Sequence, residues 1–212
     1  MKAIIFDLDG TLVDSMSYWN HLNKDFMKTK GVEVSDEVNH KLITMSSRGA
    51  LKFLKEHYEL KESVDKLFNE MKDVIIEFYT NKVEPKENAL EVLKYLKEKG
   101  YKIVIGTSTE EEFARIVVEK YGIDEFIEKI YTVENIGISK EEKEFFLEIA
   151  DKICEKPEDV ALVDDNHLAL KAAREAGLIT FGIYDENSKD VWDKIKGENK
   201  NSIEGLIELK EV

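Results

Sequence analysis

The sequence lacks the features that mark secreted or membrane-bound proteins. It has a single cysteine, Cys154, so an intrachain disulfide is excluded. No basic, apolar and small-residue segment typical of a signal peptide opens the chain, because Asp7 interrupts the first apolar run. No hydrophobic run is long enough to span a bilayer. We therefore expect a cytoplasmic protein.

Positive charge is also in deficit. The 212 residues include 31 lysines and arginines against 45 aspartates and glutamates, a formal net charge of -14. This balance argues against a nucleic-acid or anionic-membrane partner, although it leaves room for a local basic pocket or a bound cation. A small anionic substrate would need such a pocket. The histidines lack metal-ligand spacing, and the sequence does not indicate an oligomeric state.

The rest of the composition is that of a globular protein. With 42% hydrophobic residues, the chain can form one domain plus a smaller one. Strand patterns occur at residues 2–9, 101–107, 129–133, 159–165 and 178–184. Helical patterns lie between them, and those at 87–100 and 167–177 each end at a glycine that leads directly into a strand. This alternation predicts an α/β fold with a parallel sheet.

Residues 15–82 interrupt the alternation, because they contain no convincing strand pattern. They read as roughly four helices, at residues 15–30, 35–45, 48–58 and 61–80. We therefore expect a helical cap domain at residues 15–82 and a core formed by residues 1–14 and 83–212. An insert after the first strand would lie over the carboxyl edge of the sheet, where open α/β folds bind their ligands.

Several of the expected strands end in polar residues. A parallel strand that is buried on both faces has no need of polar side chains unless a site lies at its carboxyl end. The groups are Asp7 with Asp9, Thr107 with Ser108, the later Lys140, and Asp164 with Asp165. Because parallel strands end at one edge of a sheet, this topology predicts a single shared site. Gathered carboxylates repel one another and invite a divalent cation, and oxygen ligands select magnesium or calcium over zinc. The hydroxyls and the lysine suit a phosphoryl group.

Each group alone has a simpler explanation. An Asp-Gly step after an apolar run is also a turn signal, and Thr107 with Ser108 could cap a helix. Asp164 with Asp165 could cap the next helix, and a lone lysine such as Lys140 is usually solvated. The ordered set is what favours a site.

The order of DLDGT, a strand ending in Thr-Ser, a lysine, and a strand ending in Asp-Asp resembles the haloacid dehalogenase superfamily over nearly the whole chain. FDLDGTLVDS is the most specific part. The helical insert is similar to the C1 cap of the phosphoglycolate phosphatase and β-phosphoglucomutase branch. The resemblance implies a Rossmann-like core and a magnesium-dependent phosphatase that acts on a small phosphorylated metabolite.

By this resemblance Asp7 would be the nucleophile that forms an aspartyl phosphate. Asp9 would be the acid/base that protonates the leaving oxygen and then activates water, since residues i and i+2 can present carboxyl groups to one side. The implied magnesium ligands are Asp7, the main-chain carbonyl of Asp9, and Asp165, with Asp164 as a weaker or indirect partner. The implied phosphate-binding residues are Thr107, Ser108 and Lys140.

The chain departs from the family pattern around the lysine. The usual GKPxPDxF motif is here ISKEEKEFF, without either proline, so Lys143 competes with Lys140 for the role. In the third expected cap helix, Arg48 stands where the mutase branch carries a phosphate-contacting arginine in a similar stretch. We therefore include Arg48 among the candidate substrate-binding residues, with a solvated side chain as the alternative.

Other functions stay open beside the phosphatase. A phosphosugar mutase would share the scaffold, but that branch carries a histidine where this chain has Trp19. Lys72 is a candidate for a mutase-like cap lysine, but the helix lengths differ too much to align it. A receiver-like signalling domain uses similar residues in another order and has no helical insert. A non-catalytic binding protein would be expected to lack one of the four motifs, and none is clearly missing.

Overall fold

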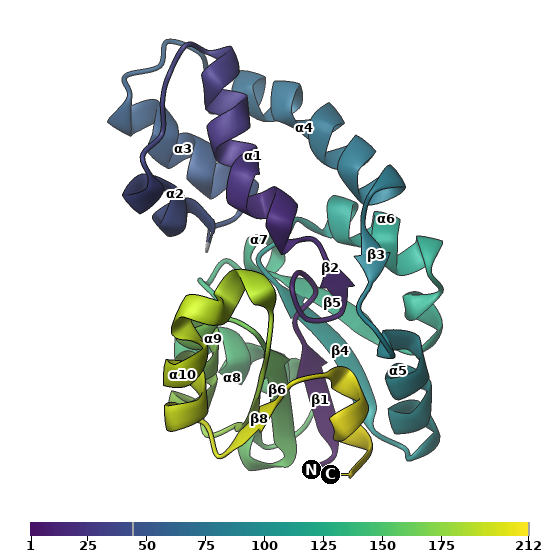
Figure 1. The fold of residues 1–212 in the computed structure, drawn as a ribbon. Helices are drawn as coiled ribbons and strands as arrows, with labels where there is room; N and C mark the ends of the chain where they lie inside the picture. Colours follow the sequence, from purple (N-terminus) through teal and green to yellow (C-terminus); the bar gives the residue numbers. More distant parts are fainter. Residues whose placement is uncertain (44, 212) are drawn as a thin grey trace.

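A six-stranded parallel sheet forms the centre of the computed structural model, which describes residues 1–43 and 45–211 (Figure 1). The strand order is β5-β4-β1-β6-β7-β8. The bounds are β1 (Ala3–Phe6), β4 (Lys102–Thr107), β5 (Lys129–Thr132), β6 (Val160–Asp164), β7 (Ile179–Ile183) and β8 (Asn201–Ile203). The five strands expected from the sequence are therefore confirmed. Strand β8, which the sequence did not indicate, extends one edge.

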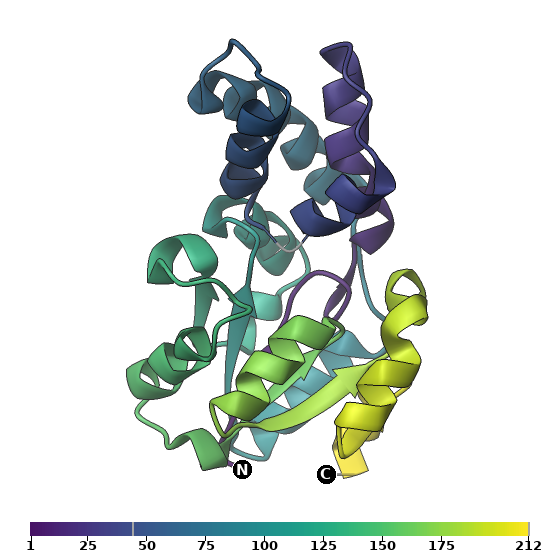
Figure 2. The same cartoon turned by 90° about the vertical axis from the view of Figure 1, so that its left-hand side faces the viewer.

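Helices cover both faces of the sheet, as Figure 2 shows from the side. Side chains of β1 alternate, so Ile4 and Phe6 belong to one apolar cluster, and Ala3 and Ile5 belong to another on the opposite face. The first cluster includes residues of α5 (Ala89–Glu98) and α6 (Glu111–Lys120). The second includes residues of α8 (Lys143–Lys152), α9 (His167–Glu175) and α10 (Lys189–Glu198). The central strands are thus buried on both sides, as their continuous apolar runs predict.

Four helices of the described chain occupy residues 15–82, beyond the carboxyl ends of the strands (Figure 1). They are α1 (Met16–Thr29), α2 (Asp36–Ile43), α3 (Ser47–His57) and α4 (Val64–Asn81). The hydroxyls of Ser46 and Ser63 cap α3 and α4 by accepting the amides of Gly49 and Lys66. The four expected helices are confirmed, whereas Thr44, in the second of them, and Val212 lie outside the described residues. The division into cap and core domains stays a prediction.

The chain enters and leaves this helical insert through a two-stranded antiparallel ladder. Strand β2 (Val13–Asp14) pairs with β3 (Glu84–Pro85), so that Val13 faces Pro85 and Asp14 faces Glu84. The remaining elements are short: α7 (Val133–Ile136) and 3₁₀ helices at Ile123–Glu125, Pro157–Asp159, Glu186–Ser188 and Leu206–Glu211. Among the helices of the described chain, none combines the length and apolarity needed to cross a membrane.

Candidate active site

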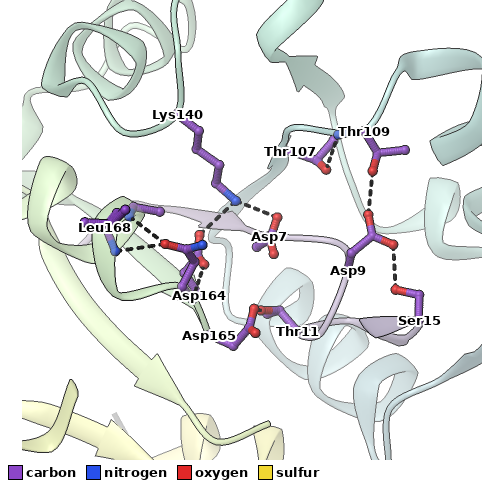
Figure 3. Close-up of polar contacts among 12 residues, drawn as sticks. Asp7, Asp9, Thr11, Ser15, Thr107, Thr109, Lys140, Asp164, Asp165 and Leu168 are labelled. Atoms are coloured by element: carbon purple, nitrogen blue, oxygen red, sulfur yellow. Dashed lines mark hydrogen bonds and ion pairs between the residues drawn. The ribbon is translucent and has the colours of Figure 1, made fainter. Parts of the chain in front are cut away.

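The polar residues that the sequence placed at strand ends meet at one edge of the sheet (Figure 3). Phe6, the last residue of β1, lies beside Ile105 of β4 and Val163 of β6, so Asp7 and Asp164 emerge at one level and Thr107 follows one residue further along. The Asp7 amide still donates to the Val163 carbonyl at 3.0 Å, which fixes the backbone from which the carboxylate projects. Parallel pairing alone therefore brings these side chains together.

Lys140 reaches this edge from the segment between α7 and α8. Its Nζ lies 2.5 Å from Asp7 Oδ1 and 2.8 Å from Asp164 Oδ2, and its side chain is buried. Burial opposes the charged amine, but the two carboxylates outweigh it and raise the pKa of Lys140 above its ordinary value. Lys143, the competing residue, is exposed at the start of α8. The structure thus brings Lys140, and not Lys143, to the site.

Three buried carboxylates form the acidic part of the site. Oxygens of Asp7, Asp164 and Asp165 all lie within 4.8 Å of one another. Burial raises the pKa of Asp7 well above its usual range against the opposing charge of Lys140, and burial together with Asp164 raises that of Asp165 to about 7. One lysine does not balance three such carboxylates, and their oxygens fit a hard divalent cation. Asp164 thus lies within the cluster, whereas the Asp9 carbonyl as a ligand stays a prediction.

Neighbouring groups orient the carboxylates of this cluster. Asp165 accepts hydrogen bonds from Ser188 Oγ at 2.8 Å and from Thr11 Oγ1 at 3.5 Å, and Asp164 accepts the Asn166 amide at 2.8 Å. Gly10, with a φ of +85°, passes so close that a Cβ would lie 2.8 Å from Asp165 Oδ2. The glycine of DLDGT is therefore needed both for the backbone turn and for the close approach to Asp165.

Asp9 turns away from Lys140, toward Thr109 and Ser15, as Figure 3 shows. Its Oδ2 accepts Thr109 Oγ1 at 2.7 Å, and its Oδ1 accepts Ser15 Oγ at 2.6 Å. Two further donors come from the helical insert: Tyr79 Oη in α4, at 2.5 Å, and Trp19 Nε1 in α1, at 3.1 Å. Sequence reasoning missed Tyr79, because no local pattern links a residue of α4 to a strand end so far along the chain.

Sequence reasoning also missed Thr109 and Ser188. Thr109 lies two residues after Thr107, whose Oγ1 accepts the Thr109 amide at 3.0 Å. The third hydroxyl of the Thr-Ser-Thr run was therefore a further candidate that the sequence offered. Ser188 belongs to the stretch GIYDENSKDVW, which begins at the end of the last expected strand and contains none of the four motifs. Its hydroxyl nevertheless fixes Asp165.

A cavity of about 430 Å³ lies over these residues, between the sheet edge and the helical insert. Its lining includes the sequence-predicted residues Asp7, Asp9, Thr107, Ser108, Lys140 and Asp165. The structure does not bring Arg48 there. The Arg48 guanidinium pairs instead with Asp65 at 2.7 Å and lies 4.0 Å from the centre of the Phe68 ring. The cavity is thus lined by two candidate catalytic carboxylates, by hydroxyls, by one ammonium and by Asp165 of a cluster that could hold a metal ion.

Comparisons with known proteins place this site in a family. The sequence profile described as haloacid dehalogenase-like hydrolase matches residues 4–183. A Thermotoga maritima protein named phosphorylated carbohydrates phosphatase is 21% identical over 178 residues, which cover 84% of this chain and 82% of that protein. A Clostridium perfringens protein named putative pyrophosphatase PpaX is 25% identical over 183 residues, covering 86% of this chain and 84% of that one.

A solved structure shares the whole fold. The protein described as a predicted phosphoglycolate phosphatase from Haemophilus somnus superposes with a TM-score of 0.80 at 21% identity, covering 100% of this chain and 97% of that one. The likeness extends over the sheet and the helical insert alike, since the whole chain is covered. With the family profile spanning β1 to β7, the strands that carry the site, this chain belongs to the haloacid dehalogenase-like hydrolase family.

Proposed function

We propose that this hydrolase is a magnesium-dependent phosphatase that cleaves small phosphate monoesters through an aspartyl phosphate. The observation that carries the proposal is that two carboxylates, Asp7 and Asp9, line the same cavity. Asp7 also accepts a hydrogen bond from Lys140 Nζ at 2.5 Å. The names of the relatives, a phosphatase of phosphorylated carbohydrates and a putative pyrophosphatase, support phosphoryl groups as the substrate.

In the first half-reaction Asp7 attacks phosphorus. A bond forms between a carboxylate oxygen of Asp7 and phosphorus, the ester P–O bond breaks with its electron pair on the leaving oxygen, and protonated Asp9 gives that oxygen a proton. Lys140 offsets the negative charge of nucleophile and phosphoryl group, and Thr107 and Ser108 supply hydroxyl donors. Magnesium, held by Asp7, Asp165 and the Asp9 carbonyl, would supply positive charge for the phosphoryl oxygens.

In the second half-reaction water attacks phosphorus. Asp9, now a carboxylate, takes a proton from the water as the new P–O bond forms, and the bond to Asp7 breaks to restore its carboxylate. Inorganic phosphate leaves. The helical insert closes the cavity over the sheet edge and limits access of bulk water, which is the role proposed for residues 15–82 as a cap domain.

Hydrolysis is favoured over phosphosugar transfer by the side chain beside Asp9. Trp19 holds the position at which the mutase branch carries a histidine, and its Nε1–H donates to Asp9 at 3.1 Å. An indole N–H donates a hydrogen bond but cannot accept a proton, so Trp19 cannot act as the general base that a histidine at this position could provide.

Phosphate release from a panel of phosphate esters, with magnesium and with a chelator, tests the proposal. We expect release that requires magnesium and is abolished in Asp7→Asn, a nearly isosteric change that removes the nucleophile. Asp73→Asn, the same change at an exposed position of α4, is the matched control. Turnover by Asp7→Asn near that of the control would refute the assignment of the nucleophile.

A further inference from the structure

The cavity over the candidate active site carries little positive charge. Among the described residues that line it, Lys140 is the only lysine or arginine, and it is engaged with Asp7 and Asp164. Acidic residues are numerous by comparison: beside the buried aspartates, the exposed Glu141 and Asp190 also line it. Lys140 and a divalent cation supply three positive charges between them, and the buried carboxylates of Asp7, Asp164 and Asp165 already offset these charges. A second anionic group on a ligand would meet mainly carboxylates.

Arg48 and Lys72, the two insert cations that the family resemblance raised as candidates, pair with carboxylates outside the cavity. Arg48 pairs with Asp65 and lies over the Phe68 ring, and Lys72 pairs with Glu112 of α6. Neither of them lines the cavity, although Arg48 lines an adjoining pocket that shares Met45 and Glu141 with it. In this structure the described part of the insert therefore covers the site without placing a lysine or arginine in the cavity lining.

Large apolar side chains also line the cavity, beside the acids. Met16, Trp19 and Met45 line it from the insert, and Leu168 and Val191 line it from α9 and α10. Leu168 and Val191 are 41% and 39% exposed, unusually open for large apolar residues of this chain. A ligand that covers them removes apolar surface from water, which favours binding by about 25 cal/mol per Å². These residues favour an apolar group beside the phosphoryl group.

We propose that the preferred substrates are phosphate monoesters whose leaving group is uncharged and largely apolar. This inference rests on the phosphatase function proposed above and narrows its substrate class. Esters that carry a carboxylate or a second phosphate, and pyrophosphate itself, are poor substrates, because the described lining offers their second charge no lysine or arginine besides Lys140, and His167 is paired with Glu198. A volume of about 430 Å³ accommodates a phosphoryl group and a leaving group of roughly aromatic-ring size.

Two aryl phosphates that differ in one substituent test the proposal. With magnesium present, we expect kcat/KM for 4-methylphenyl phosphate to exceed that for 4-carboxyphenyl phosphate by about tenfold or more. The carboxylate-bearing phenol is the more acidic, so leaving-group ability alone favours the opposite order. Pyrophosphate should be hydrolysed more slowly than the methylphenyl ester. Equal or reversed values would overturn the inference while leaving the phosphatase intact, whereas no hydrolysis of any ester would overturn the phosphatase itself.

Substitution of the exposed Val191 tests whether charge causes the preference for uncharged leaving groups. Val191→Lys places an ammonium beside the cavity, and Val191→Gln is its uncharged control. We expect Val191→Lys to shift the preference toward the carboxyphenyl ester by about threefold to tenfold, less at high salt, with no such shift in the glutamine variant. An unchanged preference in a folded Val191→Lys protein, as judged by circular dichroism, would overturn the proposed origin of the selectivity.

Discussion

At the scale of single residues, Asp9 shows how one carboxylate can be positioned from several parts of the chain. Thr109 holds it from the core, and Ser15, Trp19 and Tyr79 hold it from the helical insert. Tyr79 is fully buried, and burial with the nearby charge of Asp9 raises the pKa of its hydroxyl well above the ordinary value. The hydroxyl therefore remains a donor at any working pH, and Tyr79 is a positioning residue for Asp9.

Tyr79→Phe should lower kcat by roughly 10-fold to 100-fold, the range that follows from losing a hydrogen bond to a charged group of about 1.5 to 3 kcal/mol. The loss should be larger for esters with poor leaving groups, which depend more on proton donation. Tyr18→Phe removes a hydroxyl from the same insert, where it donates only to the Val74 carbonyl, and should change kcat little. Equal losses in both variants, or equal losses for good and poor leaving groups, would contradict the role of Tyr79.

Lys140→Ala should lower kcat/KM by about 100-fold or more, because it leaves Asp7 and Asp164 buried without their cation. Lys143→Ala, at an exposed position three residues away, should stay near wild type. Steady-state kinetics of the two variants decides between them. A severe defect in Lys143→Ala would show that Lys143, and not Lys140, is the lysine of the family motif in the ISKEEKEFF segment.

The site residues that could be predicted are those fixed by strand topology. Asp7, Thr107 and Asp165 follow strands that must end together, so their convergence requires only the order of the strands. Tyr79 and Ser188 could not be predicted, because their contacts depend on how a helix is rotated and where a late loop returns. The position of Arg48 likewise depends on how α3 is rotated. The structure places its guanidinium against Asp65 and Phe68 and not in the cavity.

At the scale of elements, α3 of the insert is joined to the core through a buried carboxylate. Glu110, just before α6, accepts Ser47 Oγ at 2.9 Å and the Arg48 amide at 3.3 Å, so it caps the N-terminus of α3 from outside the helix. Burial raises the pKa of Glu110, and the hydrogen bonds from Ser47 and Arg48 oppose this only in part. The folded state consequently binds a proton at Glu110 more tightly than the unfolded state does.

This difference predicts how Glu110 affects stability with pH. The folded pKa is raised, so the contribution of Glu110 is fully present below its unfolded pKa of about 4.3 and is lost as pH rises through the folded pKa. Relative to wild type, Glu110→Gln should therefore become progressively more stable in urea unfolding as pH rises from about 4 to 7. Glu98→Gln, an exposed carboxylate at the end of α5, should show no such trend. A difference that stays constant or falls with pH would contradict the prediction.

The elements that sequence patterns missed are the shortest ones. The five central strands and the four insert helices carry enough apolar residues for a period to be recognised. Strands β2 and β3 have two residues each and β8 has three, too few for any alternation to appear. These strands form because neighbouring segments supply partners for their backbone groups, which is information that a local window does not contain.

At the scale of the whole molecule, the carboxylate cluster links distant parts of the chain. Asp7 follows β1, whereas Asp164 and Asp165 end β6, and their mutual repulsion makes the metal-free fold less stable than it would be with a cation. A cation that binds only the folded state stabilises it by about 2.7 kcal/mol at a concentration 100 times its Kd. For a chain of this size this corresponds to a rise in Tm of roughly 5 to 10 °C.

We therefore expect magnesium to raise the Tm of the wild-type protein in a thermal unfolding assay, without any substrate present. Asp165→Asn should abolish most of this rise, and Asp164→Asn should reduce it less, because Asp164 is also engaged by Lys140 and the Asn166 amide. Asp73→Asn on the surface of α4 should keep the full rise. The opposite ranking of Asp164 and Asp165 would exchange their roles at the metal.

The ladder between β2 and β3 holds the two ends of the helical insert side by side, and we expect the insert to be separable from the core. Because Val13 faces Pro85, the chain leaves the core and rejoins it at one place, and a tight turn there could close the core without α1 to α4. Such a shortened chain would retain Asp7, Thr107, Lys140 and Asp165 and lose Trp19 and Tyr79. We expect that exchanging this segment for another would keep Asp7, Thr107, Lys140 and Asp165 in place while it changes the side chains that cover the cavity. If these four residues carry the proposed phosphatase reaction, new specificities could arise from recombination at two adjoining points.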